Sequence, residues 1–214
     1  MLITYHGHAE FLAETAKGQR VLFDPFPTQV GFPMRRVRAD AVAVSHHHLD
    51  HDYVDKVDGK PVVVDTAGRH TPLPGVALTG TPAWHDGEGG KQRGQILCFL
   101  LEADGLKVLH LGDLGEVPEE ELKNRLFMPD VLLIPVGGTY TLDAAQAAET
   151  IRILQPRVVI PMHYRTERGG IQKVDTLQPF LQAMAPLEPS VQPLLRVTRE
   201  DLSQQPRLVE LTPR

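Results

Sequence analysis

Short apolar runs separated by turn residues dominate this chain and predict many short strands. Apolar and polar residues alternate over residues 2–6, as in a half-buried strand, and residues 11–15 and 20–24 predict two more strands. Further strands are predicted, in chain order, over residues 41–44, 61–65, 76–80, 96–102, 106–111, 131–135 and 157–161, of which the first two should be buried. The dipeptide Asp104-Gly105 predicts a tight hairpin between two of the later strands.

Helix signals are fewer. They predict helices over residues 118–126, 142–154 and 177–184. Thr141 or Asp143 can cap the second of these, which stops before Pro156. Residues 25–38 are interrupted by prolines, and residues 66–75 are rich in Thr, Gly and Pro, so both are predicted loops. The pattern as a whole predicts a mixed α and β protein.

Composition narrows the class of protein. The 214 residues are expected to form one domain, residues 1–214, with an ordinary core, since 42% are hydrophobic and 23% charged. A net charge of −5 gives no reason to expect nucleic acid as a partner. No apolar run approaches the ~18 residues that span a membrane, and no signal-peptide pattern is present, so the expected location is cytoplasmic. The single cysteine, Cys98, excludes an internal disulfide and should be a buried apolar residue. The oligomeric state is left open.

The most informative stretch is 45–51, Ser-His-His-His-Leu-Asp-His. It follows an apolar strand, so its side chains project from a rigid base. The i, i+2 spacing puts His46 and His48 on one side of an extended chain, whereas Asp50 and His51, at the start of a predicted helical turn, face a second point. Imidazoles with one carboxylate suit zinc, or iron or manganese, better than calcium. A histidine-rich surface loop is the alternative, and the position after a core strand argues against it.

These residues resemble the signature of the metallo-β-lactamase-fold superfamily. Further segments resemble it in the expected order: Trp84-His85-Asp86, His110-Leu111-Gly112-Asp113 and Pro161-Met162-His163-Tyr164. Three more, Gly7-His8-Ala9, Phe23-Asp24-Pro25 and residues 137–141, are similar to a branch of small single-domain metal-dependent hydrolases with lactonase-like members. The resemblance covers residues 1 to about 165. It implies an α/β (α+β) fold, a four-layer αβ/βα sandwich of two mixed β-sheets with helices outside.

The resemblance also implies a dinuclear metal site. The first metal would take His46, His48 and His85, the second Asp50, His51 and His163, and Asp113 would bridge them. Two divalent ions, with zinc favoured over manganese or iron, would leave open positions for a shared water. Cations ~3.5–4 Å apart lower the pKa of such a water to about 7, so that a bridging hydroxide can attack a carbonyl carbon or a phosphorus. Asp50 and Asp113 are therefore the predicted catalytic residues, and Asp50 is expected to orient the water and take its proton.

Three residues are predicted to support the ligands. Asp24 is expected either to accept a hydrogen bond from a ligand histidine or only to form a turn at a strand end. The family pattern places His8 near the mouth of the site, where it would assist substrate binding. His110 lies on the strand face opposite Asp113, and it is expected either beside the ligands or as a bystander in the core.

Two basic residues and one loop complete the predicted site. Arg165 and Arg168 flank His163 and could hold an anionic group of a substrate, although a solvated charge cluster is the favoured interpretation. The polar, Gly-rich residues 86–95 form either a candidate lid over the site or, in the favoured interpretation, a plain solvated turn.

The predicted function is a metal-dependent hydrolase that cleaves an ester-like or phosphoester bond in a small-molecule substrate, with a lactone or a phosphorylated compound slightly favoured. Three alternatives stay open. A phosphodiesterase or nuclease of the same superfamily would need a basic surface and an added domain that binds the substrate, and neither is expected from this sequence. A di-iron oxidoreductase would use much the same ligands but also a flavin-domain partner. A non-enzymatic binding protein would normally have lost ligands, and all seven residues are present.

Overall fold

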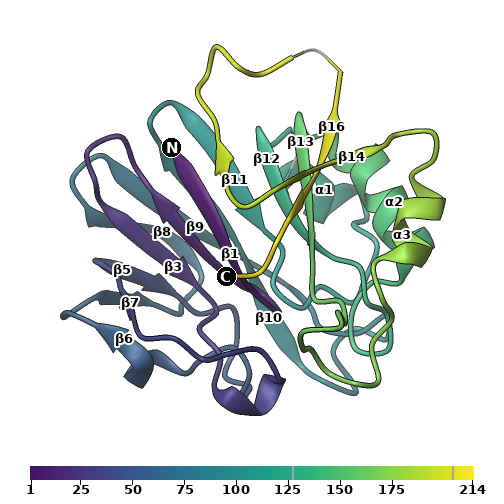
Figure 1. The fold of residues 1–214 in the computed structure, drawn as a ribbon, viewed down its shortest axis with the longest axis horizontal. Helices are drawn as coiled ribbons and strands as arrows, with labels where there is room; N and C mark the ends of the chain where they lie inside the picture. The colour runs from purple at the N-terminus through teal and green to yellow at the C-terminus, as the bar shows by residue number, and fades with distance from the viewer. Residues whose placement is uncertain (127, 204) are drawn as a thin grey trace.

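A computed structural model describes residues 1–126, 128–203 and 205–214, and these form two large mixed sheets that face each other (Figure 1). The six-stranded sheet has the spatial order Leu195–Arg196 (β15), Leu2–Gly7 (β1), Glu10–Glu14 (β2), Arg20–Phe23 (β3), Ala41–Ala43 (β5) and Val62–Val64 (β7). The eight-stranded sheet has the order Pro189–Gln192 (β14), Arg207–Leu211 (β16), Val158–Met162 (β13), Val131–Pro135 (β12), Leu106–His110 (β11), Gln95–Ala103 (β10), Val76–Trp84 (β9) and Gly68–Leu73 (β8).

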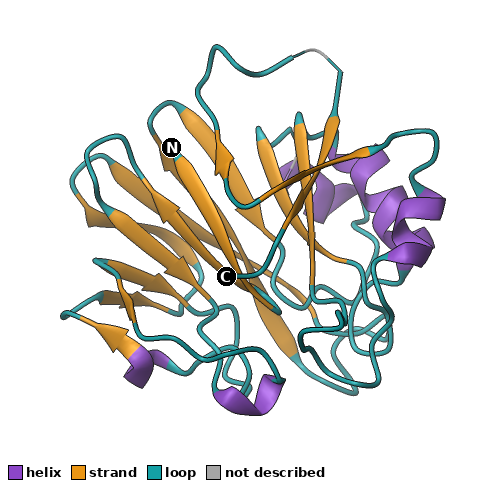
Figure 2. Ribbon diagram, in the orientation of Figure 1, coloured by secondary structure: helices purple, strands orange, loops and turns teal. Residues whose placement is uncertain are grey.

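The two sheets are covered differently on their outer faces. The α-helices Glu120–Leu126 (α1), Ala144–Leu154 (α2) and Gln178–Ala183 (α3) lie on the side of the eight-stranded sheet (Figure 2). The six-stranded sheet is covered instead by a small parallel pair, Val37–Arg38 (β4) and Val57–Asp58 (β6), together with the 3₁₀ turn Val54–Lys56. Apolar side chains of this pair and of β3 and β5 form a separate cluster there. No helix within the described ranges is long and apolar enough to cross a membrane.

One continuous apolar core lies between the sheets and beneath the helices. Aromatic residues of the six-stranded sheet, Tyr5, Phe11 and Phe23, belong to the same buried cluster as Phe99 and Leu101 of β10. The rings of Tyr5 and Phe11 stack with their centroids 4.6 Å apart. Removing this much apolar surface from water is the main favourable term that holds the two sheets together.

A hairpin turn and a helix cap that were predicted from a few residues each are both present in the structure. β10 and β11 form the predicted antiparallel hairpin, and its turn residues Asp104 and Gly105 have φ values of 55° and 71°, which suit a tight two-residue turn. Asp143 caps α2: its side chain accepts a hydrogen bond from the Gln146 backbone at 2.8 Å, and the Gln146 side chain accepts one from the Asp143 backbone at 3.0 Å.

The predicted loop over residues 25–38 ends in strand β4, Val37–Arg38, and two further predictions, both at the edges of the large sheets, were wrong. Residues 66–75 are not a loop, because Gly68–Leu73 pairs with β9 as the edge strand β8, with a register shift between His70 and Leu73. Edge strands tolerate Gly and Pro, which the sequence pattern takes as loop signals. The apolar run in β7 is not buried, since Val62 and Val63 are 47% and 43% exposed at the edge of the other sheet. An apolar run does not by itself show which strand has a neighbour on only one side.

A buried ion pair fixes the segment that follows β3. The Lys56 ammonium donates hydrogen bonds to Glu10 Oε2 and, at 2.9 Å, to the Phe26 carbonyl, and it lies over the Phe26 ring. The Phe26 backbone nitrogen donates to the same Glu10 oxygen at 3.1 Å, and His6 Nδ1 lies 2.7 Å from the other oxygen. Both charged side chains are almost fully inaccessible, so each depends on the other for compensation.

We expect Lys56→Met to lower the free energy of unfolding by ~3–5 kcal/mol, because it leaves the Glu10 carboxylate buried without its cation. Adding Glu10→Gln to this variant should recover part of the loss. Urea unfolding at constant pH measures both. The matched control is Arg69→Gln at the exposed pair Arg69–Glu102, where the loss should be about 1 kcal/mol or less. Equal losses at the buried and the exposed pair would contradict this account.

Candidate metal centre

The predicted ligands lie on loops that leave their strands at the same end of the molecule. Strands β1, β3 and β5 run in one direction, because β2 is antiparallel to both of its neighbours and β3 is parallel to β5. Strands β9, β11 and β13 also share one direction within their sheet. The residues directly after four of these strands are His8, Asp24, His85 and His163, and the 45–51 segment and Asp113 follow β5 and β11 within a few residues. Parallel strand ends therefore deliver all of them to one edge of the sandwich.

The structure brings the seven predicted ligands together in the two predicted groups. His46, His48 and His85 form one group, and Asp50, His51 and His163 form another that also includes His8; within each group the ligand atoms lie within 4.8 Å of one another. Asp113 lies between the groups. Its Oδ2 is 3.2 Å from His51 Nε2, 3.4 Å from His163 Nε2 and 3.5 Å from His85 Nε2. One carboxylate oxygen thus faces ligands of both groups.

The helical turn predicted at Asp50 and His51 is present, and it does not continue into a helix. Residues 49–51 form an isolated turn, closed by the His51 backbone nitrogen donating to the His48 carbonyl at 2.9 Å. This single turn is enough to point His51 inward, where it is fully buried, while the 28% exposed Asp50 side chain faces the opening. His47 points away from the cluster and is 67% exposed, near Asp52 and Asp65.

Unpaired polar atoms test whether this cluster suits a metal. Buried atoms without a hydrogen-bond partner among the described residues include both ring nitrogens of His163, Nδ1 of His85 and Oδ1 of Asp113. Leaving a buried polar group without a partner costs ~1–3 kcal/mol, and native proteins seldom do so without a reason. Imidazole nitrogens with carboxylate oxygens are the donor set that divalent zinc, iron or manganese prefers. The residues present therefore fit divalent cations.

Asp24 controls which ring nitrogens face the cluster. Its Oδ1 accepts a hydrogen bond from the Ser45 backbone at 2.7 Å, and its Oδ2 accepts from the Ser45 hydroxyl at 2.7 Å and from His51 Nδ1 at 3.0 Å. Because the hydroxyl proton is directed to Asp24, the Ser45 oxygen accepts from His46 Nδ1 at 2.9 Å. Nδ1 of each histidine is thus a protonated nitrogen that donates to its partner, and Nε2 is the nitrogen left to face a metal. This is the hydrogen-bonding role predicted for Asp24.

Burial and charge set the protonation of the cluster. Burial, and then the charge of His51, lowers the pKa of His46 to about 3. Burial and His163 lower the pKa of His8 to about 4, against the effect of its hydrogen bond with Asp50. Burial would also lower the pKa of His51, but the carboxylates of Asp113 and Asp24 on its two sides raise it well above the usual value. His46 and His8 are therefore neutral near pH 7, while His51 and Asp113 compensate each other.

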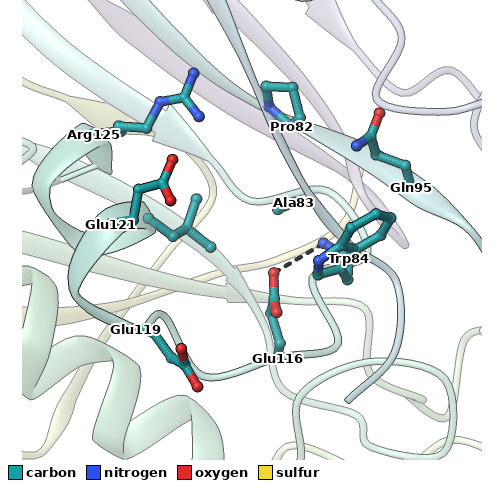
Figure 3. A pocket seen from close by; sticks show the side chains of 9 residues that line it. Pro82, Ala83, Trp84, Gln95, Glu116, Glu119, Glu121 and Arg125 are labelled. Carbon is teal, nitrogen blue, oxygen red and sulfur yellow. Dashed lines mark hydrogen bonds between the residues drawn. The ribbon is translucent and has the colours of Figure 1, made fainter. Parts of the chain in front are cut away.

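Two glycines allow the backbone to approach the ligand histidines closely. A Cβ atom on Gly115 would lie 2.4 Å from the His85 carbonyl oxygen, and one on Gly137 would lie 2.1 Å from the His163 carbonyl oxygen. Neither position accepts a side chain unless the backbone moves. The strand end that presents His85 is held further by Glu116, whose carboxylate accepts a hydrogen bond from the Trp84 backbone nitrogen at 3.0 Å (Figure 3).

A cavity of about 290 Å³ opens over the cluster. It is lined by His48, Asp50, His85, Arg93, Asp113, Tyr140, His163 and Ile171. Arg93, Tyr140 and Ile171 were not predicted from the sequence. Arg93 is the one arginine between residues 86 and 95, the loop considered as a lid, and Tyr140 lies in the segment that carried part of the family resemblance. Only these two features of the sequence could have indicated Arg93 and Tyr140 as residues of the site.

The 86–95 loop is folded around one carboxylate. Asp86 accepts hydrogen bonds at 2.8–3.0 Å from the backbone nitrogens of Glu88, Gly90, Gln92 and Arg93. Four such bonds within one loop favour the interpretation as a turn over that of a lid. The loop still reaches the site, because Arg93 lines the cavity.

The other two residues predicted to support the ligands differ in location: His8 lies in the cluster and His110 lies in the core. His8 is 2% exposed and lies inside the cluster rather than at its mouth, with Nε2 3.1 Å from Asp50 Oδ2 and 3.2 Å from His51 Nε2. His110 is a core residue: it stacks on Phe23 and donates from Nε2 to the Ala9 carbonyl at 2.8 Å.

The arginines predicted beside His163 do not reach the cavity. Arg165 donates from Nε to the Val174 carbonyl at 3.4 Å, Arg168 is exposed, and neither lines the cavity over the cluster. Its hydrogen bond directs Arg165 toward Val174 rather than into the cavity. The favoured interpretation from the sequence, a charge cluster outside the site, therefore describes them better than a role in binding substrate.

Asp24→Asn should weaken metal binding by ~10–100-fold, because an amide nitrogen can replace the acceptor that holds His51 Nδ1–H and the Ser45 hydroxyl. Metal affinity measured by competition with a chromophoric chelator tests this. His47→Gln is the matched control, since this exposed histidine in the same segment points away from the cluster. Equal affinities of Asp24→Asn and the wild type would show that the carboxylate does not orient the ligands.

Comparison with known proteins agrees with this geometry. The profile of a family described as the "Beta-lactamase superfamily domain" matches residues 2–163. A protein of Archaeoglobus fulgidus, named a UPF0173 metal-dependent hydrolase, is 35% identical to this chain, and the alignment covers 78% of this chain and 84% of that protein. A protein of Thermococcus onnurineus with the same name is 33% identical, and the alignment covers 77% of this chain and 84% of that protein. A Thermotoga maritima crystal structure, described as a zinc-dependent hydrolase of the metallo-β-lactamase superfamily, is 32% identical with a TM-score of 0.79 over 98% of this chain and 97% of that one.

These matches confirm both the resemblance and the fold class predicted from the sequence, including the sandwich of two mixed sheets. They extend over the strands and loops that carry the His and Asp cluster, from β1 to His163. The chain belongs to the β-lactamase superfamily, among its metal-dependent hydrolases.

Proposed function

We propose that this chain uses two divalent cations, with zinc favoured, to hydrolyse an ester-like or phosphoester bond in a small molecule, a lactone or a phosphorylated compound above others. The observation that carries this proposal is the position of Asp113 Oδ2 within 3.5 Å of His51, His85 and His163. A carboxylate in that position can be shared by two cations, one in each group of ligands.

The residues around the cavity would divide the work of hydrolysis. Bound divalent cations would supply acidification of a water molecule and polarisation of the electrophilic oxygen. Among the described residues that line the cavity, Asp50 is the carboxylate exposed to the opening. Burial raises the pKa of Asp50, but the hydrogen bond with His8 and the charge of His51 hold it below its usual value. Asp50 is thus ionised near neutral pH and can orient an attacking water and accept its proton.

Two features favour a small molecule over the alternatives. The cavity volume of about 290 Å³ is at the lower end of the range of ligand pockets. The net charge of −5 does not favour a polyanion such as RNA. A di-iron oxidoreductase remains the second candidate because the same nitrogen and oxygen donors bind iron. Elemental analysis and the visible spectrum of protein purified without added metal separate the two, since zinc protein has no redox-active absorption.

Asp113→Ala is expected to lower the metal content from two ions per chain to one or none, and to abolish turnover, because it removes the carboxylate shared by both groups. Asp50→Ala should also abolish turnover and weaken metal binding. Asp65→Ala, a partly exposed aspartate next to His47, is the control and should keep both metal and activity. The measurements are elemental analysis after gel filtration and initial rates. Full activity in both Asp113→Ala and Asp50→Ala would overturn the mechanism.

A panel of matched substrates tests the class of bond. Zinc-loaded protein is expected to hydrolyse a lactone, an aryl ester, an aryl phosphodiester or a thioester, with lactones or phosphorylated small molecules giving the highest kcat/KM. Removing metal with a chelator should abolish the activity, and adding zinc or manganese should restore it. An activity that survives complete removal of metal would contradict the proposed function.

A further inference from the structure

Arg93 is the guanidinium that lines the cavity over the metal cluster, and its charge is not balanced there. Among the described residues, no carboxylate lies within ion-pair distance of Arg93; its Nη2 donates only a long hydrogen bond, 3.4 Å, to the Thr139 carbonyl. The aspartates that line the same cavity, Asp50 and Asp113, belong to the metal cluster. The cavity thus offers an arginine fork opposite the site where the bond would be cleaved.

The surroundings of Arg93 hold it in a defined position. Its backbone nitrogen donates to Asp86 Oδ2 at 2.8 Å, one of the four bonds that fix the loop after His85. Its guanidinium carbon lies 5.4 Å from the centroid of the Tyr140 ring, a cation–π distance. The side chain is therefore oriented from both ends, and ordering it costs little when a ligand binds.

Another arginine that lines a cavity has glutamates in the same lining. Arg125 lines a different cavity beside Trp84, and the other lining residues there include Glu116, Glu119 and Glu121 (Figure 3). Three glutamates share that lining with Arg125, whereas the wall of the metal cavity beyond the cluster consists of Arg93, Tyr140 and Ile171. Within the described residues, this wall contains a positive charge and no negative one, so it would complement an anionic group on a ligand.

We propose that the substrate of this site carries an anionic group, a carboxylate or a phosphate, that is bound by Arg93 with Tyr140 and Ile171 as the walls around its linker. The inference rests on the proposed function, because it places the bond to be cleaved at the His and Asp cluster. Arginine presents two parallel N–H groups that match carboxylate and phosphate oxygens, and such charge-assisted bonds exceed neutral ones in strength. Arg93 is thus a specificity-determining residue, not a catalytic one.

Three 4-nitrophenyl esters test the proposal: those of butyric acid, glutaric acid and 4-phosphonobutyric acid, which differ only in the terminal group. In zinc-loaded Arg93→Gln, kcat/KM for the glutaryl or the phosphonobutyryl ester should fall ~10-fold or more, mainly through KM, as expected for a lost hydrogen bond to a charged group. The rate with the neutral butyryl ester should stay within about twofold. The two charged esters distinguish a carboxylate from a phosphate as the preferred group.

Two further variants serve as controls. Arg93→Lys should retain part of the preference, because it keeps the charge but loses the two-pronged geometry. Arg168→Gln removes an exposed arginine outside the cavity and should leave the preference unchanged. Metal content and thermal unfolding of each variant are measured in parallel. An unaltered ratio of charged to neutral ester in Arg93→Gln would overturn the proposal.

A binding experiment keeps this inference separate from the proposed function. Calorimetric titrations of the zinc-loaded protein with butyrate, glutarate and 4-phosphonobutyrate need no turnover. Wild-type protein should bind one of the two diacids more tightly than butyrate, and Arg93→Gln should lose that preference. If no ester is hydrolysed but the preference is present and depends on Arg93, the hydrolytic proposal fails and the anion site stands. Equal affinity of the wild type for all three acids would refute the anion site whether or not the esters are cleaved.

Discussion

The Asp113 carboxylate is the group on which the rest of the site depends. It is 3% exposed, and burying an anion is costly unless opposite charge or hydrogen-bond donors compensate it. Its compensation comes from His51, His85 and His163, which reach it from three different loops. Burial raises the pKa of Asp113, yet His163 and His51 hold it well below the usual value, so it remains an anion. This carboxylate, which three imidazoles approach, is also the group that the proposed function places between two cations.

The fold supplies this meeting point through strand direction and a few backbone contacts between the sheets. The His163 backbone nitrogen donates to the His8 carbonyl at 2.7 Å, and the Leu97 nitrogen donates to the Ser45 carbonyl at 2.8 Å, so the strand ends of the two sheets are joined beside the cluster. His8, Asp24 and His163 have φ values of 53°, 42° and 55°. Left-handed backbone is uncommon for non-glycine residues and concentrates at functional sites, where packing over-determines it. The candidate ligands are thus positioned by backbone contacts and backbone conformations of the protein itself.

The cavity is built differently from the metal cluster. Each predicted ligand lies at a strand end, within three residues of it, or in the segment after β5, whereas Arg93, Tyr140 and Ile171 lie farther along their connections. Loops tolerate substitution that strand ends do not, and they usually carry specificity while the scaffold carries chemistry. The wall residues proposed to contact a substrate lie in the 86–95 and 137–141 segments and, for Ile171, in the connection after β13.

The sequence by itself determined the parts of the molecule that depend on local periodicity and close spacing. The 45–51 segment, the Asp104-Gly105 hairpin and the Asp143 cap are all encoded within a few residues, and the order of the remaining ligands followed from the resemblance. Only the tertiary structure decided which strands lie at sheet edges, that His8 lies within the cluster, and that Arg93 rather than Arg165 faces the site. Alternation along a strand specifies which face is apolar, but contacts between loops distant in sequence depend on how the two sheets pack, and no local pattern records that packing.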